Sequence, residues 1–159
     1  MGIKILISLF CAVASFNNAE ELNVIREAYR EISANEETIE EFYKLTQETM
    51  PSSKPVYQGY HGAALTLKAS VAGSIKDKLS YFKEGKKLIE TAITEDSANI
   101  ELRMIRLSVQ SNVPKIVGYR RNMEEDKAYI QENISTVTDP ALKKLLSGFI
   151  KNSGAFSKE

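Results

Sequence analysis

Five side chains in this sequence are candidates for binding or chemistry: Tyr60, His61, Arg103, Arg106 and Tyr119. His61 is the only histidine in the chain, and an imidazole can act as a general base or a metal ligand near neutral pH. Arg103 and Arg106 lie three residues apart, and a guanidinium group binds carboxylates through two parallel hydrogen bonds. Arg103 and Arg106 are therefore candidates for a site that binds an anion or a peptide carboxylate, and Tyr60, His61 and Tyr119 are candidates for further ligand contacts.

The same residues also have a structural interpretation, which the sequence favours. Nucleophilic catalysis needs a nucleophile, a base and an orienting group as a set, and His61 has neither a cysteine nor a pair of carboxylates beside it. Arg103, Arg106 and Gln110 would form a polar strip on an otherwise apolar helix, where buried arginine must be paired. Three acidic residues further along the chain are candidate partners: Glu124, Glu125 and Asp126.

The chain contains none of the short motifs that mark common catalytic and metal sites. It has no HExxH or GxSxG motif, no phosphate-binding glycine loop and no acidic calcium-binding loop. We therefore expect no catalytic activity, no cofactor and no metal site.

Length and composition predict one folded, soluble domain. The chain has 159 residues, of which 43% are hydrophobic and 26% are charged, and these values are ordinary for a globular protein with a core. Its 21 basic and 21 acidic residues give no formal net charge. Binding to nucleic acid irrespective of sequence depends on a surplus of basic residues, so nucleic acid is not an expected partner.

The first 19 residues differ in character from the rest of the chain. Lys4 precedes an apolar run over residues 5–13, and a small-residue cleavage site follows at Ala14 or at Ala19. This pattern predicts a secretory signal peptide, and a buried N-terminal helix is the alternative. The run is shorter than the roughly 20 residues that a membrane span needs, and no second stretch is long or apolar enough. We expect an exported protein, periplasmic or secreted.

The single cysteine, Cys11, lies inside this N-terminal segment. A bacterial lipoprotein would use such a cysteine as its lipid anchor, but the residue before it should then be small. Phe10 occupies that position, so the sequence disfavours a lipid anchor.

Apolar residues recur at spacings of three and four along the rest of the chain and predict an all-α fold of about seven helices without strands. The expected helices cover about 20–33, 36–49, 56–72, 75–94, 100–110, 122–134 and 140–152. Residues 20–152 should form a single domain of antiparallel helical hairpins, either tetratricopeptide-like or a compact helical bundle. Residues 153–159 should form a frayed tail.

Two features of these helices predict how they pack. The segment 100–110 is apolar around most of its circumference, which is typical of a central helix. Gly59, Gly62 and Gly85 each cost a helix about 1 kcal/mol relative to alanine, and they indicate close approach of a neighbouring helix. Four residues are expected to cap helix N-termini: Asn35, Ser74, Asn122 and Asp139.

The segment 79–112 resembles one unit of the tetratricopeptide family. Ile89 and Ala92 fit the end of a helix of such a repeat, and Gly85 stands where the family has a small residue. Residues 96–99 replace the turn of the family and lack its proline, and no self-repeat of about 34 residues is visible. The layout is also similar to small exported helical proteins of Bacteroidetes-type bacteria that have no assigned activity.

The tetratricopeptide resemblance implies binding of a protein or peptide. We therefore expect a binding or scaffolding module of the cell envelope without catalytic activity. The alternative is a carrier that holds a small molecule or lipid between helices near Tyr60, His61 and Arg103. An enzyme that uses His61 together with Arg103 and Arg106 is the third hypothesis.

Overall fold

The computed structural model describes residues 18–33, 35–50, 52 and 54–157, and within these ranges the chain is all-α. It forms seven α-helices, joined by short links, and no strand. Their bounds are α1 (Asn18–Glu31), α2 (Glu36–Thr49), α3 (Pro55–Val71), α4 (Ile75–Glu95), α5 (Ile100–Asn112), α6 (Met123–Asn133) and α7 (Pro140–Asn152). Three 3₁₀ turns complete these ranges: η1 (Lys115–Val117), η2 (Ile134–Thr136) and η3 (Gly154–Phe156). The predicted all-α class is confirmed.

The predicted signal peptide lies almost wholly outside the described residues. Only Asn18 and Ala19 of that segment are described, at the start of α1, and Cys11 is not. In the described ranges, no helix combines the length and hydrophobicity needed to cross a membrane.

Capping side chains account for the positions at which several helices begin. Asn35, Ser74 and Asp139 each accept hydrogen bonds from backbone N–H groups in the first turn of the following helix. These groups have no partner inside the helix, so a side-chain acceptor stabilises the terminus. The prediction for Asn122 was wrong: its side chain makes no cap hydrogen bond, and its amide donates to Glu125 Oε2 over 3.3 Å instead.

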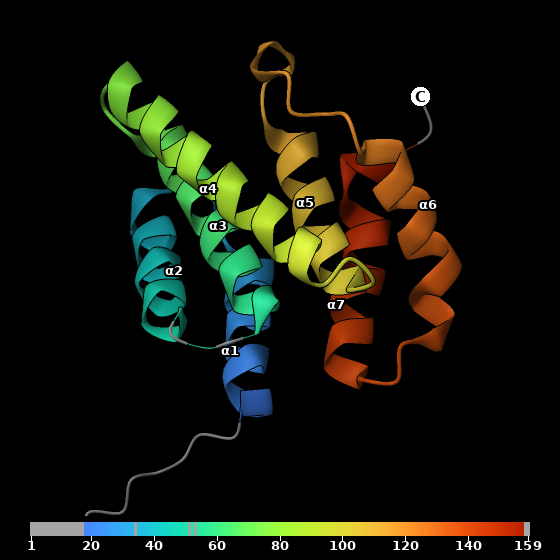
Figure 1. The fold of residues 1–159 in the computed structure, drawn as a ribbon. Helices are drawn as coiled ribbons and strands as arrows, with labels where there is room; N and C mark the ends of the chain where they lie inside the picture. Colours follow the sequence, from blue (N-terminus) through green and yellow to red (C-terminus); the bar gives the residue numbers. More distant parts are fainter. Residues whose placement is uncertain (1–17, 34, 51, 53, 158–159) are drawn as a thin grey trace, which may run out of the picture.

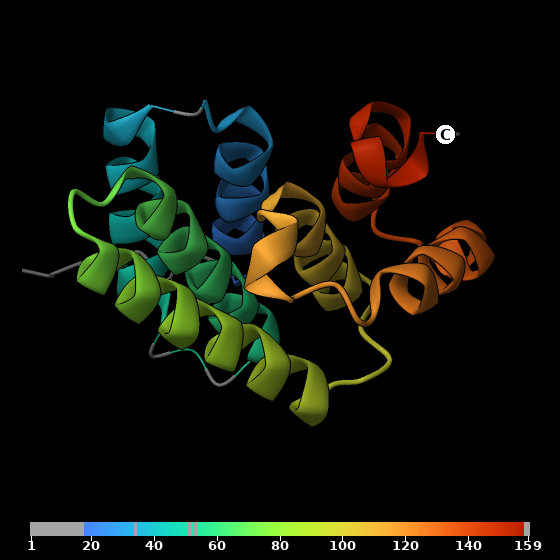
Figure 2. The same ribbon diagram turned by 90° about the horizontal axis from the view of Figure 1, so that it is seen from above.

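Successive α-helices run in alternate directions, as Figure 1 shows. Helices α3 and α4 form the most extensively packed pair, and α4 is the longest helix of the described residues, with 21 residues. Figure 2 shows α1 and α2 on one side of this pair, and α6 and α7 beyond α5. The first turns of α4 project beyond the neighbouring helices at the upper end of Figure 1, where η1 also lies.

Three glycines allow the close packing of α3 against its neighbours. A Cβ atom added at Gly62 would lie 2.7 Å from the carbonyl oxygen of Gly85, and one at Gly85 would lie 2.5 Å from that of Gly62. A Cβ at Gly59 would clash with the Leu102 side chain. Close approach of a second backbone therefore explains why helices α3 and α4 contain glycine.

Helix α5 lies at the centre of the molecule, as its apolar circumference predicts. It contacts α3, α4, α6, α7 and η3. Its buried residues include Leu102, Ile105 and Leu107, which are fully buried. Three polar residues of α5 are also buried, Glu101, Arg106 and Gln110, so this helix brings charge into the core.

Residues 153–157 of the predicted frayed tail are described and include the 3₁₀ turn η3, whereas residues 158–159 lie outside the described residues. Ser153 caps η3 by accepting a hydrogen bond from Ala155 N–H. Phe156 packs edge-on against Phe149 of α7, with ring centroids 5.7 Å apart. Burial of this aromatic ring stabilises the segment, because large aromatic side chains contribute much of the packing energy of small cores.

Candidate functional site

Two of the predicted site residues, Arg103 and Arg106, converge on one buried carboxylate. Asp126 of α6 has no exposed side-chain surface. Arg106 donates from Nε to Asp126 Oδ2 over 2.7 Å and from Nη2 to Oδ1 over 2.8 Å. Arg103 donates from Nη1 to the same Oδ1 over 3.0 Å. The two-point geometry satisfies both oxygens of this carboxylate, which is the condition for burying it.

The third predicted residue of this group, Tyr119, joins the same cluster through Glu90 of α4. Its hydroxyl donates to Glu90 Oε1 over 2.6 Å, and Arg106 Nη1 donates to Glu90 Oε2 over 3.0 Å. Burial raises the pKa of Tyr119 far above its usual value, and the contact with Glu90 raises it further. We call this set the Asp126 network, and its members are Glu90, Arg103, Arg106, Tyr119, Glu125 and Asp126.

Contacts of Arg103 beyond Asp126 hold its guanidinium at the edge of this network. Nη1 also donates to Glu125 Oε1 over 2.6 Å, and Nε and Nη2 both donate to the carbonyl oxygen of Ser97. The guanidinium lies over the ring of Tyr129, 4.6 Å from its centroid, where a cation is attracted to the aromatic face. Glu125 and Asp126 are thus observed partners, and both were among the three carboxylates expected from the sequence.

Tyr60 lies in a second network of hydrogen bonds and ion pairs, which is centred on Glu101 of α5. Its hydroxyl donates to Glu101 Oε1 over 2.6 Å. Arg26 of α1 binds Glu101 through two hydrogen bonds of 2.7 Å, and its Nη1 donates to Asp139 Oδ2 over 2.7 Å. Burial and the charge of Glu101 raise the pKa of Tyr60 well above its usual value. We call Arg26, Tyr60, Glu101 and Asp139 the Glu101 network.

The structure places His61 apart from both networks. Its Nδ1 lies 3.0 Å from Thr46 Oγ1 of α2, and its ring lies beside that of Tyr43, with centroids 5.2 Å apart. Burial lowers the pKa of His61 below its usual value, although the charge of Glu84 partly opposes this. These contacts hold the imidazole between α2 and α3, where burial favours its neutral form. The five predicted residues are therefore distributed over three environments, and only Arg103, Arg106 and Tyr119 share one.

Gln110 is buried on the same strip of α5, but its amide is not paired. Neither Oε1 nor Nε2 has a hydrogen-bond partner among the described residues, and the residue is fully buried. Nε of Arg120 is the other such side-chain atom found there. An unpaired buried amide destabilises a fold by about 1–3 kcal/mol.

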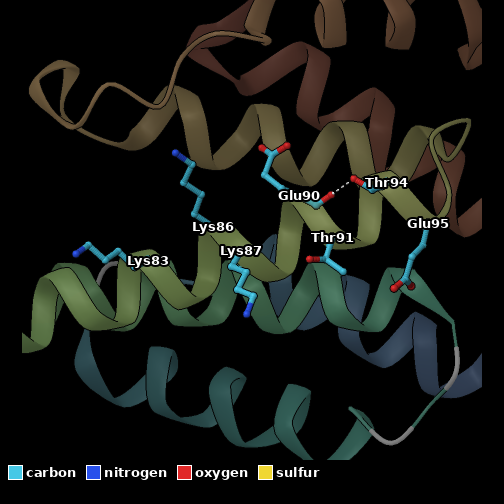
Figure 3. Close-up of a pocket in the computed structure, with 7 residues that line it drawn as sticks. All are labelled: Lys83, Lys86, Lys87, Glu90, Thr91, Thr94 and Glu95. Carbon is cyan, nitrogen blue, oxygen red and sulfur yellow. Dashed lines mark hydrogen bonds between the residues drawn. The ribbon is translucent and has the colours of Figure 1, made fainter.

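A further candidate site, which was not among the predicted residues, lies along the exposed face of α4. An open hollow of about 600 Å³ is lined there by side chains of one helix. We call these residues the α4 strip, which Figure 3 shows: Lys83, Lys86, Lys87, Glu90, Thr91, Thr94 and Glu95. Lysines occupy its N-terminal end and the two glutamates lie further along. The spacing of three and four residues between its members was the signal that could have predicted this strip. The solvent-exposed face of any helix shows the same spacing, so the pattern did not distinguish a binding site.

The packing behind the α4 strip restricts its movement. Gly85 lies against the backbone of α3, and Glu90 is held by both Tyr119 and Arg106. Lys86 Nζ lies over the Tyr119 ring, 4.9 Å from the centroid. The Thr94 hydroxyl donates to the backbone carbonyl of Glu90 over 2.8 Å, as the dashed line in Figure 3 marks. The strip thus combines exposed charge with a fixed helical backbone.

Neither chemistry nor kinship to other proteins identifies a reaction for this site. Within the described residues, no three side chains of the metal-binding types are placed to hold one ion. No protein-family model, curated protein or solved structure matches the chain.

Proposed function

We propose that this protein is an exported binding module that engages another protein or peptide along the α4 strip and performs no catalysis. One observation carries the proposal: α4 exposes a charged, open strip on a helix that is fixed from behind. The buried charges, by contrast, are paired within the two networks of α5. The signal-peptide pattern and the tetratricopeptide resemblance support the compartment and the kind of function.

The charge pattern of the strip indicates the kind of segment that would fit it. Lys83, Lys86 and Lys87 precede Glu90 and Glu95 along the helix. A partner helix or extended segment would therefore be acidic where it meets the three lysines and basic where it meets Glu95, because Glu90 is already paired with Arg106 and Tyr119. Such complementarity favours one orientation of the partner and increases the association rate.

Rigidity of α4 supports binding rather than mere exposure. When a partner docks on a helix that is already fixed, the partner loses conformational entropy but the helix loses little. The aliphatic stems of the three lysines and the methyl groups of the two threonines also supply apolar contact area beneath the charges.

The alternative hypotheses receive less support from the geometry. A carrier would hold its ligand near Tyr60, His61 and Arg103, but these side chains lie in three different environments. Catalysis by His61 with Arg103 and Arg106 would need them within reach of one substrate, and both arginines are engaged with Asp126 instead.

Site-specific photo-crosslinking in an envelope extract tests the proposal. A photoreactive phenylalanine analogue at Thr91, in the middle of the strip, should give one defined adduct, and the same analogue at exposed Lys143 of α7 should not. Adding Lys83→Glu and Lys87→Glu to the Thr91 variant should abolish the adduct, while Lys151→Glu should leave it. Identical adducts from both positions, or no adduct at Thr91, would contradict the proposal.

A further inference from the structure

Exposed apolar side chains concentrate at one end of the molecule, away from the α4 strip. Among the described residues, five large hydrophobic side chains are exposed, and four of them lie in two short segments. Ile75 and Leu79 are 77% and 53% exposed, and Ile116 and Val117 are 95% and 40% exposed. The fifth is Val24 of α1. We call residues 73–80 and 115–121 together the tip.

Both segments of the tip project from the same end of the fold. The start of α4 and the η1 turn lie at the top of Figure 1, and Figure 2 looks down onto them. Every residue from Gly73 to Ser80 is exposed. Gly118 closes η1 with a positive φ of 69°, a conformation that glycine adopts without steric cost, and the tight turn leaves Ile116 exposed at its centre.

The apolar residues of α4 form one continuous stripe that leaves the core at this end. Ile75, Leu79 and Phe82 are spaced by four and three residues and so share a face of the helix. Phe82 packs edge-on against Tyr119, with ring centroids 6.0 Å apart. The stripe therefore begins at Phe82, which packs against Tyr119 just after η1. It ends at Ile75, which the described residues leave largely exposed.

Basic residues lie close in sequence to these exposed apolar side chains. The tip carries five basic residues, Lys76, Lys78, Lys115, Arg120 and Arg121, against the single acid Asp77. Four of the five are exposed, whereas Arg120 is partly buried and donates to the carbonyl oxygen of Val113. Asp77 is engaged locally, because its carboxylate accepts a hydrogen bond from the Ser74 hydroxyl over 2.7 Å. The tip is thus strongly basic in a chain whose formal net charge is zero.

From these observations we infer that the tip binds an anionic lipid surface, with Ile75, Leu79, Ile116 and Val117 entering the boundary between headgroups and acyl chains. Exposed aliphatic side chains flanked by lysine and arginine are the composition of interfacial membrane contacts. Each basic side chain near an anionic bilayer adds to the attraction. Lysine can also extend its charged end toward phosphates while its stem lies in the apolar layer.

The composition favours lipid over a protein partner at this end. The cores of protein interfaces are enriched in aromatic residues, methionine and arginine and are depleted in lysine. The exposed apolar residues of the tip are isoleucine, leucine and valine, and three of its five basic residues are lysine. The tip and the α4 strip consist of different residues, although Tyr119 of the tip contacts Lys86 and Glu90 of the strip.

Sedimentation with vesicles gives a first test on the full chain. The protein should sediment with vesicles of mixed phosphatidylglycerol and phosphatidylcholine, less with pure phosphatidylcholine, and less again as salt rises, since salt screens exposed charges. Ile75→Gln with Leu79→Gln should lower binding to the mixed vesicles by about tenfold or more, because several buried methylene groups are lost. Val24→Gln, an exposed apolar residue outside the tip, should bind like the parent protein. Residues 1–17 are identical in all of these variants. A difference in vesicle binding between variants therefore comes from the substituted side chains.

A fluorescence measurement makes the test specific for insertion. The chain contains no tryptophan, so Ile116→Trp and Val24→Trp each introduce a single reporter at an exposed position. The emission of Ile116→Trp should shift to shorter wavelength with phosphatidylglycerol vesicles, and that of Val24→Trp should not. Equal shifts in both variants, unchanged binding of the Ile75/Leu79 double variant, or a parent protein that stays in the supernatant would overturn the inference. The inference would also be overturned if substitutions in the tip abolished a protein complex but left vesicle binding unchanged.

Discussion

Gly62 and Gly85 face each other where α3 and α4 pack together, and each leaves space for the carbonyl oxygen of the other. The contact is reciprocal, since a Cβ on either residue would lie within 2.7 Å of the opposing oxygen. Backbone atoms cannot move aside as a flexible side chain can. This pair therefore determines how closely the two helices approach and, through α4, where the α4 strip and the tip lie.

Gly85→Ala should destabilise the protein by about 1–3 kcal/mol, because overpacking forces the two helices apart. The matched control is Gly148→Ala in α7, where an added Cβ would have no neighbour within 4 Å. That change should stabilise the fold by up to about 1 kcal/mol through helix propensity alone. Urea denaturation measures both effects, and equal changes in the two variants would refute the close approach of α3 and α4.

Replacing Asp126 by leucine should destabilise the protein by about 3–5 kcal/mol, because it leaves two arginines without their buried carboxylate. Adding Arg106→Met to Asp126→Leu should recover part of this loss, since a well-packed apolar pair can replace a buried ion pair. Arg30 pairs with Glu27 and Glu31 at the surface, and Arg30→Ala should cost no more than about 1 kcal/mol. A double variant less stable than Asp126→Leu alone would argue against this description of the Asp126 network.

Gln110→Leu should stabilise the protein by about 1–2 kcal/mol, because it removes a buried amide that lacks hydrogen-bond partners. The control is Gln47→Leu on the exposed face of α2, where little change is expected. Thermal and urea unfolding of both variants provide the comparison. A less stable Gln110→Leu protein would show that the amide is satisfied in solution.

Protonation of His61 should destabilise the folded protein as pH falls. Burial depresses its pKa below the ordinary value of 6.5, so the unfolded chain takes up a proton at a higher pH than the folded protein. Above about pH 6.5 both states are neutral, and the group has no effect. Below it the free energy of unfolding should decrease by at most about 1.4 kcal/mol per pH unit until the folded pKa is reached.

Comparison with His61→Gln isolates this contribution from the other titrating groups. Urea denaturation near pH 7 and near pH 5 should show a steeper loss of stability for the parent protein than for the variant. Parallel loss in both proteins would mean that His61 has an ordinary pKa in the folded state.

Local signals predicted most of the fold. The helical periods located all seven α-helices, and Asn35, Ser74 and Asp139 begin theirs as expected from their side-chain acceptors. Asn122 makes no cap hydrogen bond, and its backbone, with φ −104° and ψ 8°, lacks the extended conformation of an N-cap residue. The central position of α5 followed from apolar residues that cover most of its circumference.

The candidate site was less predictable, because its contacts join distant parts of the chain. The pairing of Arg103 and Arg106 with acids after residue 122 could be inferred, since buried arginine needs a partner. Glu101 was not recognised, because an acid in the first turn of a helix is usually explained by the helix dipole. Its partner Arg26 lies 75 residues away, and only the packing of α1 near α5 brings them together.

Charge is unevenly distributed along this chain, whose formal net charge is zero. Helices α1 and α2 carry nine acidic and three basic residues, whereas the tip carries five basic residues and one acid. At low ionic strength such a molecule should be retained by both anion- and cation-exchange resins near its isoelectric point, since each resin contacts the region of opposite charge. The same uneven distribution of charge would turn the tip toward an anionic surface before contact, so orientation would precede binding.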